Sequence, residues 1–251
     1  MFDRPALQLD AVGLQIGGAR ILHDVTMQVG TGEMVGVIGP NGAGKTTLFN
    51  TVSGVLVPTS GRVLLAGDDV TNRAVHQRAR VGLGRTFQTS SVFPGLTARE
   101  NARLAAQSRL GGATSPWRFP RVGDEADEIG MRCLAEVGLD HHAGTVAGGL
   151  SHGDKRKLEI AMLVATEPEV VLLDEPMAGV GSGDVPGLVE VIRGLHASGR
   201  TVLMVEHHME VLLGLVDRVA VMHHGELLAM GTPKDVMADA AVQQAYLGET
   251  V

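Results

Sequence analysis

Residues 39–47, Gly-Pro-Asn-Gly-Ala-Gly-Lys-Thr-Thr, constrain the fold of this chain more than any other segment. They match the pattern G-x-x-x-x-G-K-[ST], follow the apolar run EMVGVIG (33–39) and open a helix predicted over 45–53. The glycines let backbone N–H groups surround phosphate oxygens, and the helix N-terminus adds the positive end of its dipole. The alternative is a glycine-rich turn without a ligand, but the flanking strand and helix favour a phosphate site.

Side chains of this loop and of a later acidic segment are expected to complete the site. Lys45 would reach the β- and γ-phosphates of a nucleotide, and the Thr46 hydroxyl would bind Mg²⁺. Asp174 and Glu175 end the apolar run EVVLLDEP (169–176). Asp174 would hold Mg²⁺ through water, and Glu175 could polarise an attacking water molecule. A solvated acidic pair is the alternative, which the phosphate loop in the same chain disfavours.

Short apolar runs alternate with helical patterns along most of the chain. Strands are predicted within 7–38 and at 61–67, 169–176, 201–205 and 218–223, and helices at 75–83, 97–108, 124–137, 185–197 and 209–215. This alternation is typical of βαβ units in an α/β fold. Residues 89–155 are rich in helix and are interpreted as an inserted helical subdomain. A closing helix is predicted to begin at Thr232 and Pro233 and to end at Gly248.

The segment LSHGDKRKLEIA (150–161) predicts a helix start with an unusual charge distribution. Ser151 is a suitable N-cap, and Asp154 can complete a capping box. Three basic residues at 155–157 nevertheless lie at the positive end of the helix dipole, where each cation costs up to about 1 kcal/mol. The bare N–H groups and the cations predict an anion here, although the basic side chains could equally be solvated.

The composition narrows the class of partners. The 251 residues carry a net charge of −7, which argues against nucleic acid, and 44% of them are hydrophobic, which allows a sizeable core. The single cysteine, Cys133, fits a reducing compartment. We find no signal peptide and no apolar stretch of the ~20 residues that a membrane helix needs. Any work at a membrane is therefore expected to depend on partner proteins.

The order of five motifs resembles that of the ATP-binding cassette (ABC) ATPases. The phosphate loop precedes GRTFQ with Gln88, then LSHGD, LLDEP and finally VLMVEHHM with His207. The resemblance covers essentially the whole chain and implies a P-loop NTPase (RecA-like) α/β core with a small antiparallel β subdomain and an inserted helical subdomain. The single domain would comprise a core at 1–88 and 156–231, the helical subdomain at 89–155, and a C-terminal helix at 232–251.

The resemblance also implies a role for each motif residue in an ATPase with ATP and Mg²⁺ as cofactors. Glu175 would be the catalytic base, and His207 would contact the γ-phosphate as a switch. Gln88 would sense the metal and the attacking water, and Asp174 would serve Mg²⁺ together with Thr46. The residues that would cradle ATP are Gly39, Asn41, Gly42, Gly44, Lys45, Thr46 and Thr47.

Three positions depart from the family pattern. Ile16 stands where an aromatic ring usually stacks on adenine, so it would give apolar contact without stacking and loose base selectivity. His152 replaces the usual first glycine of the LSHGD motif. Gly181 replaces a polar residue, which leaves the contact between subunits at that position undetermined.

In this family two cassettes, identical or different, face head to tail and clasp two ATP molecules. Ser151 and Gly153 would therefore bind the γ-phosphate of an ATP held by the other subunit, which identifies the anion expected at that helix start. Other partners would be two transmembrane permease subunits and, indirectly, an external solute-binding protein. The chain would act as a peripheral subunit on the cytoplasmic face of the inner (plasma) membrane.

Segments such as RTFQ, DEPMAG and AYLGE resemble the ATP-binding subunits of branched-chain (hydrophobic) amino acid importers, with urea and amide importers as close relatives. The ATPases of lipopolysaccharide export are the first alternative, and a soluble cassette without a transport function is the weaker one. Because specificity resides in the permeases and the binding protein, the transported solute cannot be inferred from this sequence.

Phe93 and Leu96 follow Gln88 and are interpreted either as apolar anchors for a permease helix or as subdomain core. The adjacent pairs His141-His142, His207-His208 and His223-His224 have poor metal geometry, because neighbours on a strand point to opposite faces. Surface or capping roles are expected for all of these histidines except His207.

Overall fold

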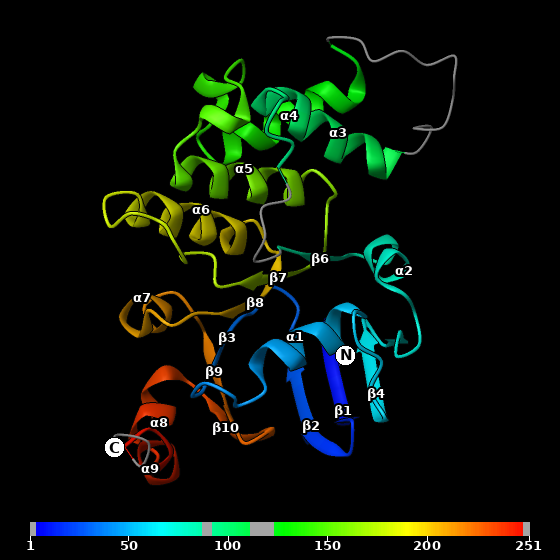
Figure 1. Cartoon of the computed structure of the whole chain (residues 1–251), viewed down its shortest axis with the longest axis vertical. Coiled ribbons are helices and arrows are strands. Elements are labelled where there is room, and N and C mark those ends of the chain that lie inside the picture. Colours follow the sequence, from blue (N-terminus) through cyan, green and yellow to red (C-terminus); the bar gives the residue numbers. More distant parts are fainter. Residues whose placement is uncertain (1–3, 87–91, 111–122, 248–251) are drawn as a thin grey trace. The chain divides into compact units, whose positions relative to one another are not determined.

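The computed structural model describes residues 4–86, 92–110 and 123–247, which form two compact units (Figure 1). The first unit comprises Met1–Arg85, Glu169–Glu175 and His196–Val251, and the second comprises Thr86–Pro168 and Pro176–Leu195. The domain boundaries that we infer from the sequence, with a helical insertion at 89–155, stay a prediction.

A six-stranded sheet lies in the first unit, in the order β10 (Glu226–Gly231), β9 (Arg218–His223), β3 (Met34–Ile38), β8 (Thr201–Val205), β7 (Val170–Asp174) and β6 (Leu83–Arg85). The strands from β9 to β6 are parallel, and β10 is antiparallel to β9. Every residue of β3, β7 and β8 is buried, as continuous apolar strands of a parallel sheet require. The carboxyl ends of these strands therefore meet at one edge of the sheet.

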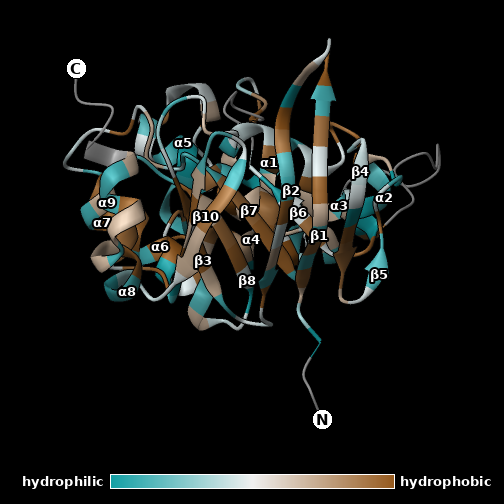
Figure 2. Cartoon of the chain, turned by 90° about the horizontal axis from the view of Figure 1, so that it is seen from below, coloured by the Kyte–Doolittle hydropathy of each residue, from teal (hydrophilic) through white to brown (hydrophobic). Residues whose placement is uncertain are grey.

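A smaller antiparallel sheet has the order β2 (Ala19–Val29), β1 (Leu7–Ile16), β4 (Ser60–Leu65) and β5 (Asp68–Asp69). Its buried residues join those of the larger sheet and of α1 (Lys45–Ser53) in one hydrophobic cluster, which is mainly Leu and Val with the ring of Phe49. Figure 2 shows hydrophobic colour on β7 and hydrophilic colour on β5. Both sheets agree with the fold class expected from the sequence.

The first unit also contains the helices α2 (Val75–Arg80), α7 (Met209–Leu213), α8 (Pro233–Ala238) and α9 (Ala240–Leu247). The second unit contains α3 (Ala98–Leu110), α4 (Glu125–Glu136), α5 (His152–Val164), most of α6 (Val185–Ala197), and 3₁₀ turns at Asp140–His142 and Ala147–Gly149. Among the residues that the structure describes, no helix is both long enough and apolar enough to cross a lipid bilayer.

The predicted helix at 75–83 is wrong over its last three residues. Helix α2 ends at Arg80, and Gly82 adopts a left-handed φ of 91° that interrupts helical geometry. The next three residues pair with β7 as β6. The sequence patterns also miss β10, whose residues are all exposed or half-buried and lack a clear apolar alternation.

The single closing helix is also a wrong prediction, because the structure contains two helices there. Thr232 caps the first, and Pro233 opens it, as predicted. Asp239 has an extended backbone, and its carboxylate accepts hydrogen bonds from the N–H groups of Ala241 and Val242. This aspartate therefore caps a second helix rather than continuing the first. The predicted end at Gly248 lies outside the described residues.

Arg78 of α2 is fully buried and binds the carboxyl end of α1. Its guanidinium donates to the carbonyl oxygens of Thr51 and Val52 at 2.7 Å each, of Thr71 at 2.8 Å and of Arg73 at 3.0 Å. Burial lowers the pKa of this guanidinium. Because α1 has no basic residue in its last turn, Arg78 supplies the cation that its C-terminal carbonyl groups favour.

We predict that Arg78→Met lowers the free energy of unfolding by about 3 kcal/mol or more, because several buried carbonyl groups lose their donor. Urea denaturation of the full chain measures this change. Arg80→Met, on the exposed face of the same helix, is the matched control and should stay within about 0.5 kcal/mol of the wild type. A loss of less than about 1 kcal/mol in Arg78→Met would contradict the prediction.

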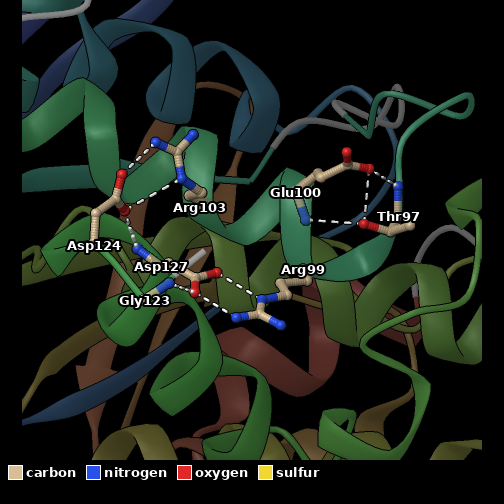
Figure 3. A network of polar contacts seen from close by, with 7 residues as sticks. All are labelled: Thr97, Arg99, Glu100, Arg103, Gly123, Asp124 and Asp127. Atoms are coloured by element: carbon tan, nitrogen blue, oxygen red, sulfur yellow. Dashed lines mark hydrogen bonds and ion pairs between the residues drawn. The ribbon is translucent and has the colours of Figure 1, made fainter. Parts of the chain in front are cut away.

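In the second unit, two ion pairs join the first two turns of α3 to the start of α4 (Figure 3). Arg99 donates to both carboxylate oxygens of Asp127, which also accepts from the N–H of Gly123 at 2.6 Å. Arg103 donates to Asp124, the N-cap of α4, at 2.7 Å. The hydrogen bonds from Arg99 lower the pKa of the Asp127 carboxyl group.

A second cap precedes α3 in the same view (Figure 3). The backbone N–H of Thr97 donates to the Glu100 carboxylate at 2.7 Å, and the N–H of Glu100 donates to the Thr97 hydroxyl at 3.2 Å. This reciprocal pair is a capping box, and it lowers the pKa of Glu100. The start of each helix is therefore held by side-chain hydrogen bonds as well as by packing.

We predict that Asp127→Asn flattens the acid limb of the stability profile. The folded pKa of Asp127 lies below the unfolded value of about 4, so its ionisation stabilises the fold above that value. This contribution is lost as the pH falls through the folded pKa. Urea unfolding between pH 6 and 3 should show a smaller decline for Asp127→Asn than for the wild type. Asp140→Asn, an exposed substitution in the same unit, should follow the wild-type profile.

Candidate functional site

The phosphate loop lies between β3 and α1, and two of its glycines have no room for a side chain. Gly39 has a φ of 149°, and a Cβ atom there would lie 2.1 Å from the carbonyl oxygen of Met222. Gly44 has a φ of 98°, and a Cβ atom would lie 3.1 Å from the side chain of Leu22. Backbone conformation therefore favours glycine at both positions, and packing against the Met222 carbonyl oxygen also requires it at Gly39.

The turn between β9 and β10 supports the back of this loop. The N–H of Gly225 donates to the carbonyl oxygen of Ala43 at 3.0 Å, and the carbonyl oxygen of Gly225 accepts from His23 at 2.9 Å. These contacts connect the loop to two strands distant in sequence. The loop therefore has a fixed backbone shape, which favours preorganised binding of phosphate.

Lys45 and the start of α1 give this loop a positive electrostatic character. The Lys45 side chain is buried, and its Nζ donates to the carbonyl oxygens of Gly39 at 2.6 Å and Pro40 at 2.9 Å. Because the N-cap residue is Gly44, no side chain of that residue caps the first N–H groups of α1, and the first turn contains no acidic residue. The helix N-terminus therefore keeps its affinity for an anionic ligand. Thr46 is exposed next to Lys45.

Two acidic residues leave the sheet at the carboxyl end of β7. Asp174 is the last residue of the strand and is only 1% exposed. Glu175 has a left-handed φ of 48°, and its N–H donates to the carbonyl oxygen of Val205 on β8 at 2.9 Å. Its carboxylate lies 2.9 Å from Nε2 of His207. The predicted base and the predicted γ-phosphate contact are therefore hydrogen-bond partners within one chain.

Glu206, which the sequence analysis does not identify, shapes the segment that carries His207. It is 3% exposed, and its carboxylate accepts from the backbone N–H of His207 at 2.9 Å and from that of His208 at 3.3 Å. It also lies 3.2 Å from Nδ1 of His208. An acidic residue directly after the apolar run of β8 is the signal that could have revealed it.

Arg85, at the end of β6, is a second residue that the sequence analysis misses. It forms a buried ion pair of 2.8 Å with Asp174. The two residues are 89 positions apart, so only the pairing of β6 with β7 brings them together. In the sequence, a single arginine at the end of a short strand is only a weak indication of a buried ion pair.

The structure brings most of the predicted nucleotide residues together in the first unit. The loop residues, Asp174, Glu175 and His207 all lie at the carboxyl edge of the larger sheet. Ile16 ends β1 and is 52% exposed, so its side chain is accessible to a ligand. Gln88 lies outside the described residues. The roles assigned to all of these residues stay predictions.

Ser151 and Gly153 belong to the second unit and start α5. The Ser151 hydroxyl accepts from the N–H of Asp154 at 3.0 Å, which confirms the predicted N-cap. A Cβ atom on Gly153 would lie 2.7 Å from a carboxylate oxygen of Asp184, so this position allows only glycine without rearrangement. His152 and Gly181, the other departures from the family pattern, are both exposed.

Arg156 is not one of the solvated cations that the sequence allowed. It is 8% exposed and donates to the carbonyl oxygen of Pro176 at 2.9 Å and to Glu159 at 2.7 Å. Lys155 and Lys157 are half-buried. Of the two interpretations of Phe93, the subdomain-core role is wrong, because this ring is 54% exposed, whereas Leu96 is half-buried.

The donor chemistry at the first site suits Mg²⁺. The Thr46 hydroxyl and the Asp174 carboxylate are hard oxygen donors, and Mg²⁺ is usually held by one or two such groups together with phosphate oxygens. Over residues 4–86, 92–110 and 123–247, no three His, Cys, Asp or Glu side chains cluster as a metal site of their own. The residues present therefore fit a metal that arrives with a nucleotide.

Comparison with known families gives two matches along this chain. The family described as "ABC transporter" matches residues 22–178, and the family described as "Branched-chain amino acid ATP-binding cassette transporter" matches residues 226–251. The high-affinity branched-chain amino acid transport ATP-binding protein LivG of Escherichia coli (strain K12) is 36% identical over 98% of this chain and 99% of its own length. The lipopolysaccharide export system ATP-binding protein LptB of Acidithiobacillus ferridurans is 37% identical over 91% of each chain.

Solved structures give the same result for the fold. The ADP conformation of MJ1267, an ATP-binding cassette of an ABC transporter, superposes with a TM-score of 0.85 at 30% identity, over 98% of this chain and 99% of that one. The dimeric post-hydrolysis state of the cassette MJ0796, bound to ADP and phosphate, superposes with a TM-score of 0.75 at 25% identity, over 90% and 98% of the two chains. The predicted fold class is confirmed.

Proposed function

We infer that this chain, which belongs to the ABC transporter family, is the subunit whose ATP hydrolysis powers an importer of branched-chain or other hydrophobic amino acids. It is an ATP-binding ATPase of that family. The observation that carries the assignment is the pairing of Glu175 with His207, at 2.9 Å, on the same sheet edge as the phosphate loop. The match at 226–251 and the similarity to LivG support the amino acid substrate.

Each residue at this edge has a distinct task in the proposed reaction. The loop amides and Lys45 bind the β- and γ-phosphates. Thr46 and Asp174 would hold Mg²⁺, which would supply positive charge to balance the negative charge on the transferred phosphoryl group. Glu175 orients and deprotonates the attacking water. We propose that His207 exchanges its contact with Glu175 for the γ-phosphate when ATP is bound. Gln88 is proposed to sense the metal and the water.

Cassettes of this family work as dimers within transporter complexes. We propose that Ser151 and Gly153 complete the ATP site of a second cassette, where the α5 N-terminus meets the γ-phosphate. Ile16 would contact the adenine of the ATP held by its own chain. Two permeases and an external solute-binding protein would complete the importer, with this chain at the cytoplasmic face of the inner membrane.

Lipopolysaccharide export is the second candidate function, and the similarity to LptB is the observation that favours it. A urea or amide importer is a further alternative because of its close relation to the branched-chain group. These alternatives share the ATP chemistry and differ in the membrane partners.

We predict that Glu175→Gln lowers the rate of ATP hydrolysis by 100-fold or more and leaves ATP binding intact, because only the base is lost. Phosphate release and binding of a fluorescent ATP analogue measure the two effects on the full chain. Glu190→Gln, on the exposed face of α6, is the matched control and should hydrolyse ATP at the wild-type rate. Wild-type turnover in Glu175→Gln would remove this residue from the reaction.

We predict that the tagged chain, extracted from its native membranes in mild detergent, co-purifies with two polytopic permeases and a second cassette. Mass spectrometry identifies these partners, and an external binding protein among them can be screened for its amino acid ligand. Components of a lipid exporter would instead support the second candidate. Ribosomes without any membrane protein would contradict a transport function.

A further inference from the structure

We propose that Arg85 is a positioning residue that holds the Asp174 carboxylate against the phosphate-loop helix α1. Through this contact it sets how strongly Mg²⁺ supports nucleotide binding. The proposal rests on the proposed function, in which Asp174 serves Mg²⁺. The effect of Arg85 on nucleotide binding passes through Asp174.

One arm of the Arg85 guanidinium holds Asp174. Its Nη2 lies 2.8 Å from Oδ2 of Asp174, and the two side chains are only 8% and 1% exposed. A buried carboxylate is costly unless a counter-charge and hydrogen-bond donors lie beside it. The ion pair therefore places a cation beside the buried carboxylate of Asp174 and restricts its rotation.

The other arm reaches the last turns of α1. Nη1 lies 2.8 Å from the side-chain oxygen of Asn50 and 2.7 Å from the hydroxyl of Ser53. The guanidinium carbon also lies 6.0 Å from the centre of the Phe49 ring. Because α1 begins at the phosphate loop, Arg85 links Asp174 to the helix that carries Lys45 and Thr46.

The planar fork of arginine is what this link requires. Two nitrogen atoms in a fixed geometry bind a carboxylate on one side and two side-chain oxygens on the other. A lysine would keep the charge but would offer one compact ammonium group, which cannot hold both sides with the same geometry. Arg85→Lys therefore keeps a positive charge beside Asp174 but removes the geometry that orients its carboxylate.

A second buried arginine, Arg78, already anchors the C-terminal end of α1, so α1 does not depend on Arg85 alone for its position. Arg78 donates to the C-terminal carbonyl groups of α1 at Thr51 and Val52. Arg85 instead donates to the side chains of Asn50 and Ser53 on α1 and also to Asp174. The distinctive feature of Arg85 is thus the link between the helix and the acidic residue.

The test compares the dissociation constants of a fluorescent ATP analogue with EDTA and with Mg²⁺, on the full-length chain. We expect Arg85→Lys to reduce the gain in affinity due to Mg²⁺ by at least fivefold and to change the constant in EDTA by less than twofold. In an Asp174→Asn background, Arg85→Lys should change the gain by less than twofold, because its effect passes through Asp174.

Two further variants make the result specific. Arg62→Lys alters an exposed arginine with an equally short ion pair, to Asp10 at 2.7 Å, and should leave the Mg²⁺ gain unchanged. Asn50→Ala removes one helix contact but leaves the Arg85–Asp174 pair, so a twofold or larger loss of the gain is expected. If thermal unfolding shows that Arg85→Lys does not fold, the test rests on Asn50→Ala. An Asn50→Ala variant in which Mg²⁺ raises the affinity for the ATP analogue as much as in the wild type would overturn the proposal.

The remaining outcomes separate this inference from the proposed function. The positioning role would be overturned if folded Arg85→Lys kept the full affinity gain due to Mg²⁺. It would also be overturned if Arg85→Lys lost the same share of that gain in the wild-type and Asp174→Asn backgrounds. Either result would leave the ATPase assignment intact. If Asp174→Asn alone keeps the full Mg²⁺ gain, then Asp174 does not serve the metal, and that part of the proposed function fails with it.

Discussion

The pairing of β8 with β3 on one side and β7 on the other is the constraint on which the site depends. Val205 of β8 lies opposite Val37 of β3 and Asp174 of β7, so the three strands end in one row. Asp174 is part of this row, and the phosphate loop, Glu175 and His207 follow it. Because side chains alternate between the faces of a strand, a slip by one residue would reverse the acidic side chains and separate them from the loop.

Helix α1 connects this edge to the buried arginines through its two charged ends. Its N-terminus has no side-chain cap or acidic residue and is available to an anion, whereas its C-terminus has no cation of its own. Arg78 binds the C-terminal carbonyl groups, and Arg85 binds side chains in the last turns. The negative C-terminal end of the α1 dipole is therefore balanced by arginines of the protein, and the positive N-terminal end is available to a phosphate group.

Local features were predictable from the sequence, and contacts between distant residues were not. The phosphate loop, the cap at Ser151 and the helix at 185–197 depend on neighbours a few residues away, so their patterns are visible in a short window. Arg85 and Glu206 owe their roles to partners and burial that only the folded sheet provides. The break at Asp239 was missed because helix periodicity continues across a residue that prefers to cap.

The left-handed backbone of Glu175 points to a function only in combination with the contacts of this residue. Ala11 and Asp24 also have left-handed φ values, near 47°, but they lie in the irregular β1–β2 pair and carry no comparable chemistry. Glu175 combines such a φ with a hydrogen bond to Val205 and a partner in His207. A conformation that costs about 1–3 kcal/mol is thus retained where it turns a carboxylate out of the strand direction toward a histidine. Strain, acidity and a neighbouring histidine together support the catalytic role proposed for Glu175, whereas strain alone would not.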